Sequence, residues 1–141
     1  MTKRPTKSTP RAGPVKLGRY IMRDAVIVVH YDPAMTDGSE VWNGWVDGAY
    51  LHMTIGHEPE WGRMVVSALH EVVELGLMLN DAAFSPADSL RREDLGRYRY
   101  MFDHDVLTRV CNHAGDMLAY LLPDLEKAWK KHRAKPGKGS R

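Results

Sequence analysis

The residues whose types and spacing could do chemistry lie in one short segment, His70-Glu71-Val72-Val73-Glu74. His70 and Glu74 are four positions apart, so on a helix their side chains share one face, one turn above each other. Imidazole nitrogen and carboxylate oxygen are both ordinary ligands of divalent metals. The segment therefore predicts half of a metal site, held by His70 and Glu74.

The surroundings of this segment favour a bound cation. His70 and Glu74 lie in the middle of a mostly apolar run, where a charged group is costly unless it is paired or bound to a metal. Glu71 and Glu74 repel each other, and no lysine or arginine occurs from Met64 to Ser89. A nearby divalent cation would remove that repulsion.

A third ligand is needed, and Phe102-Asp103-His104-Asp105 supplies the best candidates. This segment opens a second predicted helix and is expected to fold back on the first. We expect His104 to be the third ligand. Asp103 or Asp105 remain alternatives, either as ligands or as partners that orient the imidazole.

Two long helices are expected to position these groups. Apolar residues from Trp61 to Leu79 recur at helical spacing and predict a buried helix over 60–79. A second helix is expected over 103–122, followed by a short helix that Pro123 restarts and that runs to Lys131. Between the two long helices we expect a polar linker, with a short helix over 86–90 and an aromatic strand or extended segment over 98–102.

The first half of the chain predicts strands. Arg19 to Tyr31 contains a β-branched run that suits a strand buried on both faces. Glu40 to Val46 and Ala49 to Ile55 flank Asp47-Gly48, a strong two-residue hairpin signal. The expected fold class is α+β, with a three-stranded, mainly antiparallel sheet packed on two long helices and a short C-terminal helix.

Charge and composition divide the chain into a domain with two tails. Residues 1–19 carry six and residues 127–141 carry seven of the 20 Lys and Arg residues, and neither segment contains an acid. We expect disordered basic tails over 1–17 and 134–141, and one domain over 18–133. The tails could contact nucleic acid through phosphates or act only as solubilising ends.

The same composition bears on the setting of the protein. No run approaches the roughly 20 apolar residues of a membrane helix, and no apolar segment of a secretory signal follows the basic N-terminus. The single cysteine, Cys111, is expected to be a small buried hydrophobe. We therefore expect a cytoplasmic protein with no membrane contact.

The helical segment resembles the His-Glu-x-x-His helix of zinc proteases, with Glu74 where the second histidine would stand. More narrowly, Ala49 to Lys131 resembles small, largely uncharacterised phage-encoded proteins with a minimal zincin-like fold. The stretches that carry the resemblance are IGHEPEW, LHEVVELGLML and FDHDVLTRVCNHAGDMLAYLLPDLEKAWKK. The resemblance implies a phage origin and, with it, a host-cytoplasm setting.

Carried over by position, the resemblance makes His70, Glu74 and His104 metal ligands and Glu71 the general base on a bound water. Zinc is the expected ion. The carboxylate of Glu74 in place of an imidazole raises the preference for Mn²⁺ or Mg²⁺ and weakens the case for peptidase activity.

Several functions remain open at this point. The first is a metal-dependent, peptidase-like hydrolase, and the second is a non-catalytic phage accessory protein that binds an unknown protein or peptide. A third is nucleic-acid association through the tails. A nucleotide pyrophosphohydrolase would normally need a helical bundle without the expected sheet. A phosphodiesterase of the paired His-x-Thr kind would need a second motif beside His52-Met53-Thr54, and the chain has none.

Overall fold

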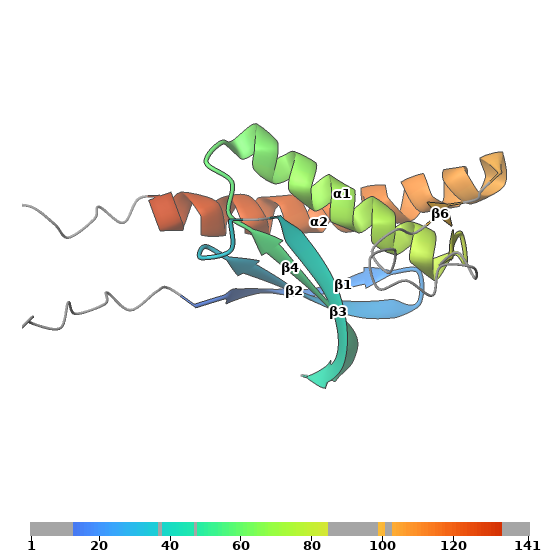
Figure 1. The fold of residues 1–141 in the computed structure, drawn as a ribbon, viewed down its shortest axis with the longest axis horizontal. Helices are drawn as coiled ribbons and strands as arrows, with labels where there is room; N and C mark the ends of the chain where they lie inside the picture. The colour runs from blue at the N-terminus through green and yellow to red at the C-terminus, as the bar shows by residue number, and fades with distance from the viewer. Residues whose placement is uncertain (1–12, 37, 47, 85–98, 101–102, 134–141) are drawn as a thin grey trace, which may run out of the picture.

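The computed structural model describes residues 13–36, 38–46, 48–84, 99–100 and 103–133 (Figure 1). Within these ranges, neither helix is long and apolar enough to cross a lipid bilayer. The elements in chain order are β1 (Val15–Met22), β2 (Ala25–Asp32), β3 (Ser39–Val46), β4 (Ala49–Gly56), α1 (Trp61–Leu79), β5 (Ala83–Phe84), β6 (Arg99–Tyr100) and α2 (His104–Arg133).

The main sheet has four strands in the order β1-β2-β4-β3, so the prediction of three strands is wrong. The β1–β2 and β3–β4 pairs are antiparallel, whereas β2 and β4 run parallel. The sheet is therefore mixed and mainly antiparallel. A separate two-stranded sheet joins β5 to β6.

The single strand predicted over Arg19 to Tyr31 is in fact two strands joined by a tight turn. Arg23 adopts a left-handed backbone conformation, with φ of 57°, between β1 and β2. Glycine or asparagine usually occupies a left-handed turn position. An arginine there does not indicate a turn, so the sequence did not predict one. β1 begins at Val15, so the last part of the predicted 1–17 tail belongs to the sheet.

The predicted hairpin around Asp47-Gly48 is confirmed. β3 ends at Val46 and β4 begins at Ala49, and these two residues pair with each other. Gly48 has φ of 75°, a conformation that glycine adopts without a steric cost. This positive φ is what a tight two-residue hairpin turn requires.

Both long helices cover the same face of the main sheet (Figure 1). α1 contacts β3 and β4, whereas α2 contacts β1. The helices pack antiparallel, because the ring centroid of Trp61 lies 5.6 Å from that of Trp129 while Gly76 faces Val110 at the other end. Their buried core residues include Met64, Ala68, Val72 and Leu75 in α1 and Ala114, Met117, Leu121, Leu125 and Trp129 in α2.

α2 runs without interruption through Pro123, so the prediction of a separate C-terminal helix is wrong. Proline removes one helical hydrogen bond and crowds the preceding turn. Pro123 is exposed, and the buried stripe continues across it from Met117 through Leu121 to Leu125. Tertiary packing on both sides of the proline therefore keeps the helix continuous.

Two other expectations concern α2 and the linker before it. Cys111 is exposed, which contradicts its predicted burial, because the buried stripe passes through Val110 and Ala114 instead. The helix predicted over 86–90 lies outside the described residues. α2 ends at Arg133, and the domain bounds of 18–133 stay a prediction.

Gly56, at the end of β4, allows the loop before β3 to cross close to the sheet. A Cβ atom there would lie 2.1 Å from the carbonyl oxygen of Gly38 and 2.7 Å from that of Met35. The Gly56 N–H donates to the Ser39 hydroxyl at 3.2 Å, and the His57 N–H donates to the Met35 carbonyl at 2.6 Å. This crossing fixes the position of Ser39 beneath α1.

We expect Gly56→Ala to lower the free energy of unfolding by about 1–3 kcal/mol, because backbone atoms would have to move apart. Urea denaturation measures the change. Gly115→Ala is the matched control, since nothing lies within 4 Å of a Cβ at this exposed α2 position. It should stabilise the protein by up to about 1 kcal/mol. Equal effects of the two substitutions would contradict the close approach.

Candidate metal centre

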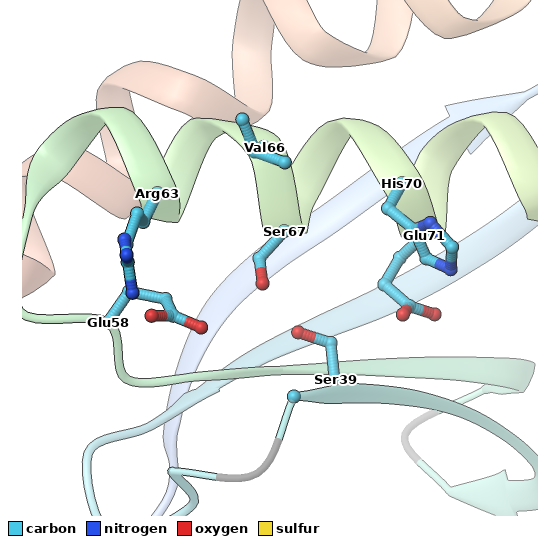
Figure 2. Close-up of a pocket in the computed structure, with 8 residues that line it drawn as sticks. Ser39, Glu58, Arg63, Val66, Ser67, His70 and Glu71 are labelled. Carbon is cyan, nitrogen blue, oxygen red and sulfur yellow. The ribbon is translucent and has the colours of Figure 1, made fainter.

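The helix α1 brings His70, Glu71 and Glu74 together. One ligand atom from each of the three side chains lies within 4.8 Å of the others. The cluster forms because the apolar stripe of α1 packs against α2 and the sheet, and this fixes which side of the helix carries the three polar groups. In Figure 2, His70 and Glu71 project from α1 toward the strand that carries Ser39.

The three side chains differ in exposure. The His70 Nε2 atom lies 3.5 Å from a Glu74 carboxylate oxygen, and these side chains are 70% and 29% exposed. Glu71 is only 7% exposed. Its carboxylate points into the groove that α1 borders, but desolvation still makes the ionised form costly. Of the three side chains, Glu71 would therefore gain most from a cation.

The pKa of Glu71 reflects its burial and its charged neighbours. Burial raises the pKa of Glu71 above its usual value of 4.5, and the charges of Glu74 and Glu40 raise the pKa further. His70 acts in the opposite direction and lowers it. A divalent cation beside these groups would reverse the balance, because it favours the ionised carboxylates. The donor set of one imidazole and two carboxylates therefore fits a divalent metal.

His104 lies apart from this cluster. Because Gly76 faces Val110 and Trp61 faces Trp129, His70 lies level with the middle of α2, near Leu118. His104 opens α2 about 20 Å away along the helix axis, at 1.5 Å per residue. The structure therefore does not place the predicted third ligand where it would complete the site.

The acids beside His104 serve the start of α2. Asp103 accepts a hydrogen bond from the Val106 N–H at 2.9 Å, which is the role of an N-cap residue, and Asp105 lies in the first turn. Both positions at the start of the helix agree with the sequence prediction. Neither acid belongs to the metal cluster, which is confined to α1 among the described residues.

An open groove of about 480 Å³ leads to the cluster between α1 and the start of β3 (Figure 2). It is lined by Gly38, Ser39, Glu58, Arg63, Val66, Ser67, His70 and Glu71. Sequence reasoning missed its polar lining. Arg63, Ser67 and Glu71 occur every four residues, a stripe that would have indicated this face of the helix. Nothing in the sequence indicates Ser39, which the loop crossing at Gly56 brings to the groove.

Two further histidines, His52 in β4 and His57 directly after it, have structural partners. His52 is fully buried, its Nε2 lies 2.9 Å from the Gly44 carbonyl oxygen, and its ring stacks on Trp42 at 3.9 Å between centroids. His57 shares a 2.7 Å hydrogen bond with the hydroxyl of Tyr31. These contacts assign both side chains to packing of the sheet rather than to the cluster on α1.

No protein-family model, curated protein or solved structure matches the chain.

The metal-free protein should be stabilised by Glu71→Gln above the folded-state pKa of Glu71. Because the pKa of Glu71 is higher in the folded state, the protonated carboxyl stabilises the fold. This contribution is complete below pH 4.5 and is lost as the pH rises through the folded-state pKa. The variant cannot ionise, so its advantage should grow as pH rises from 4.5 through the folded-state pKa and then stay constant. Denaturant unfolding in the presence of a chelator measures both curves.

The control for this experiment is Glu60→Gln, because Glu60 is exposed and its side chain makes no capping hydrogen bond to α1. This substitution should leave the pH dependence of the wild type unchanged. Parallel curves for wild type and Glu71→Gln would show that Glu71 is not strained in its ionised form.

Proposed function

We propose that this protein is a metal-dependent hydrolase whose ion is held by His70 and Glu74 of α1. The observation that carries the proposal is the convergence of three donor side chains within 4.8 Å, one of them a buried carboxylate, at the end of a groove. A bound divalent cation would lower the pKa of a coordinated water and polarise a carbonyl group.

Glu71 is assigned the role of general base. Its position carries the assignment, because it is the most buried member of the cluster and points from α1 into the groove beside His70. One of its carboxylate oxygens lies within 4.8 Å of donor atoms of His70 and Glu74, so a water on an ion held by those two side chains would lie near it. The proton taken from the attacking water would pass through Glu71 to the leaving group.

Zinc is the proposed ion, with Mn²⁺ or Mg²⁺ as alternatives, because the site mixes one nitrogen donor with carboxylate oxygens. The resemblance of Ala49 to Lys131 to phage-encoded zincin-like proteins supports an amide bond as the proposed substrate and the host cytoplasm as the proposed setting. A helix with His-Glu-x-x-Glu over a mixed sheet is compatible with such a scaffold.

Zinc should bind the untagged protein with a stoichiometry of one, as measured by isothermal titration calorimetry. His70→Ala and Glu74→Ala should each weaken binding by about tenfold or more, because each removes a ligand. His104→Ala is the matched control, since His104 is also exposed but lies at the far end of α2. Absence of zinc uptake, or an equal loss in His104→Ala, would contradict the site.

A second candidate function rests on the opposite face of the sheet. Ile21 pairs with Val26, the residues after Val26 and Tyr50 pair as Ile27 and Leu51, and the ring centroid of Tyr50 lies 5.6 Å from that of Trp45. These four side chains are 67%, 39%, 47% and 78% exposed, and they form an apolar row across all four strands. Such a row favours a non-catalytic protein that binds a protein partner. Nucleic-acid contact through the tails stays a prediction, because residues 1–12 and 134–141 lie outside the described residues.

Turnover separates the two candidates. The zinc-loaded protein should cleave members of a fluorogenic peptide library, and Glu71→Gln should retain zinc while losing at least about 100-fold in rate, the contribution typical of a general base. Calorimetry and cleavage are measured on the same preparation. Retained zinc without any cleavage by the wild type would reject the hydrolase and leave the interaction protein. Loss of zinc in Glu71→Gln would make Glu71 a ligand instead of a base.

A further inference from the structure

A polar pocket lies where three segments of the chain meet: the turn between β1 and β2, the end of α1 and the first half of α2. It is lined by Arg23, Asn80, Asp81, Arg109 and His113. Its volume is about 410 Å³, within the range of pockets that hold small molecules. A Cβ atom on Gly76 would lie 3.1 Å from the Val110 side chain and 3.7 Å from the Met22 sulfur. The three segments therefore pack directly against one another, and this packing fixes the walls of the pocket.

The backbone is strained at two residues of this pocket. Arg23 has φ of 57° and Asp81 has φ of 56°, and they are the two non-glycine residues with positive φ within the described ranges. Arg23 occupies the β1–β2 turn and Asp81 follows α1, positions at which glycine or asparagine adopts this conformation at lower cost. Retained backbone strain is characteristic of functional sites. The charged side chains at these two positions therefore require a reason other than the turns themselves.

The nitrogen donors of the pocket are positioned by the fold but are not used up by it. The Arg23 Nη1 atom donates to the Leu79 carbonyl, and its Nε atom lies 3.8 Å from an Asp24 carboxylate oxygen, which leaves part of its five N–H groups for a ligand. Arg109 and His113 are one turn apart and share a face of α2. Within the described residues, the Arg109 guanidinium forms no ion pair and the buried Nδ1 atom of His113 has no hydrogen-bond partner.

We propose that this pocket binds the phosphate group of a small phosphomonoester that carries hydroxyl groups, such as a sugar phosphate. A phosphomonoester presents three terminal oxygens, and a guanidinium donates a forked pair of hydrogen bonds to such oxygens. Arg23, Arg109 and the imidazole of His113 together supply more donors than the two oxygens of a carboxylate would use. The pocket shares no residue with the metal cluster or the groove beside it, so the inference stands apart from the proposed hydrolase.

The residues after α1 favour the hydroxylated ester over bare phosphate. The exposed carboxylate of Asp81 repels a free anion but accepts a hydrogen bond from a hydroxyl group. Asn80 donates its amide N–H to the Gly76 carbonyl at 2.8 Å, which fixes the amide and leaves its oxygen as an acceptor. The pocket therefore has acceptors on the α1 side, for hydroxyl groups, and cationic donors from the turn and α2. A nucleic-acid phosphodiester fits less well, because it has one negative charge and two terminal oxygens.

Calorimetry on the full chain tests the inference with ribose 5-phosphate, inorganic phosphate and ribose as probes. A chelator is present throughout, so that phosphate cannot bind an ion at the metal cluster. Ribose 5-phosphate should bind about fivefold more tightly than inorganic phosphate because of its added hydroxyl contacts, and ribose should not bind. Arg109→Gln should weaken binding of ribose 5-phosphate by at least about tenfold. Arg109→Lys, which keeps the charge but not the fork, should weaken it by about threefold or more.

Lys127→Gln is the matched control, because it removes the same charge from an exposed position of the same helix, about 27 Å from Arg109 along the axis. It should leave the affinity unchanged. Arg23→Gly is a second variant, since glycine relieves the strained turn and should remove binding from a folded protein. No binding of ribose 5-phosphate by the wild type, an equal loss in Lys127→Gln, or equal binding of inorganic phosphate would overturn the inference. An oligonucleotide that binds through Arg109 while ribose 5-phosphate does not would also overturn it.

Discussion

The packing of α1 against α2 and the sheet is the constraint on which the rest of the structure depends. Met64, Ala68, Val72 and Leu75 repeat at helical spacing and are all fully or almost fully buried. This stripe fixes the rotation of the helix about its axis, so the residues between its members have no freedom in where they point. Glu71 immediately precedes Val72 and is therefore drawn into the edge of the interface. The burial of a carboxylate follows from the stripe rather than from any interaction that the carboxylate makes.

The burial of Glu71 disfavours its ionised form, which is the form that the proposed function needs. The ionised form of Glu71 is disfavoured by desolvation and by two neighbouring acids, and only His70 opposes this. A hydrophobic residue at the same position would extend the core at no electrostatic cost. A cation held by His70 and Glu74 would remove the repulsion between the carboxylates, because its positive charge would lie beside both of them. Ion binding would therefore favour the ionised form of Glu71.

The sequence predicted the elements whose signals are local. The stripe of α1 and the glycine turn of the β3–β4 hairpin both lie within a few residues, and both are confirmed. The errors arise where tertiary packing overrides local preference. Arg23 adopts a turn conformation without a turn residue, and Pro123 stays inside a helix because the core stripe continues past it. His104 lies away from the cluster because the antiparallel packing of the helices puts the first turn of α2 beyond the end of α1.

The same distinction applies to the candidate site. His70, Glu71 and Glu74 belong to one helix, so their convergence could be predicted from spacing alone, and the structure brings them together. The groove beside the cluster lies between α1 and the start of β3, and no spacing rule relates these two segments to each other. Ser39 reaches the site only because Gly56 lets a loop cross the end of β4 at backbone contact distance. The donor groups of the cluster can therefore be read from a local motif. The shape and lining of the groove beside it depend on contacts between segments that are distant in the chain.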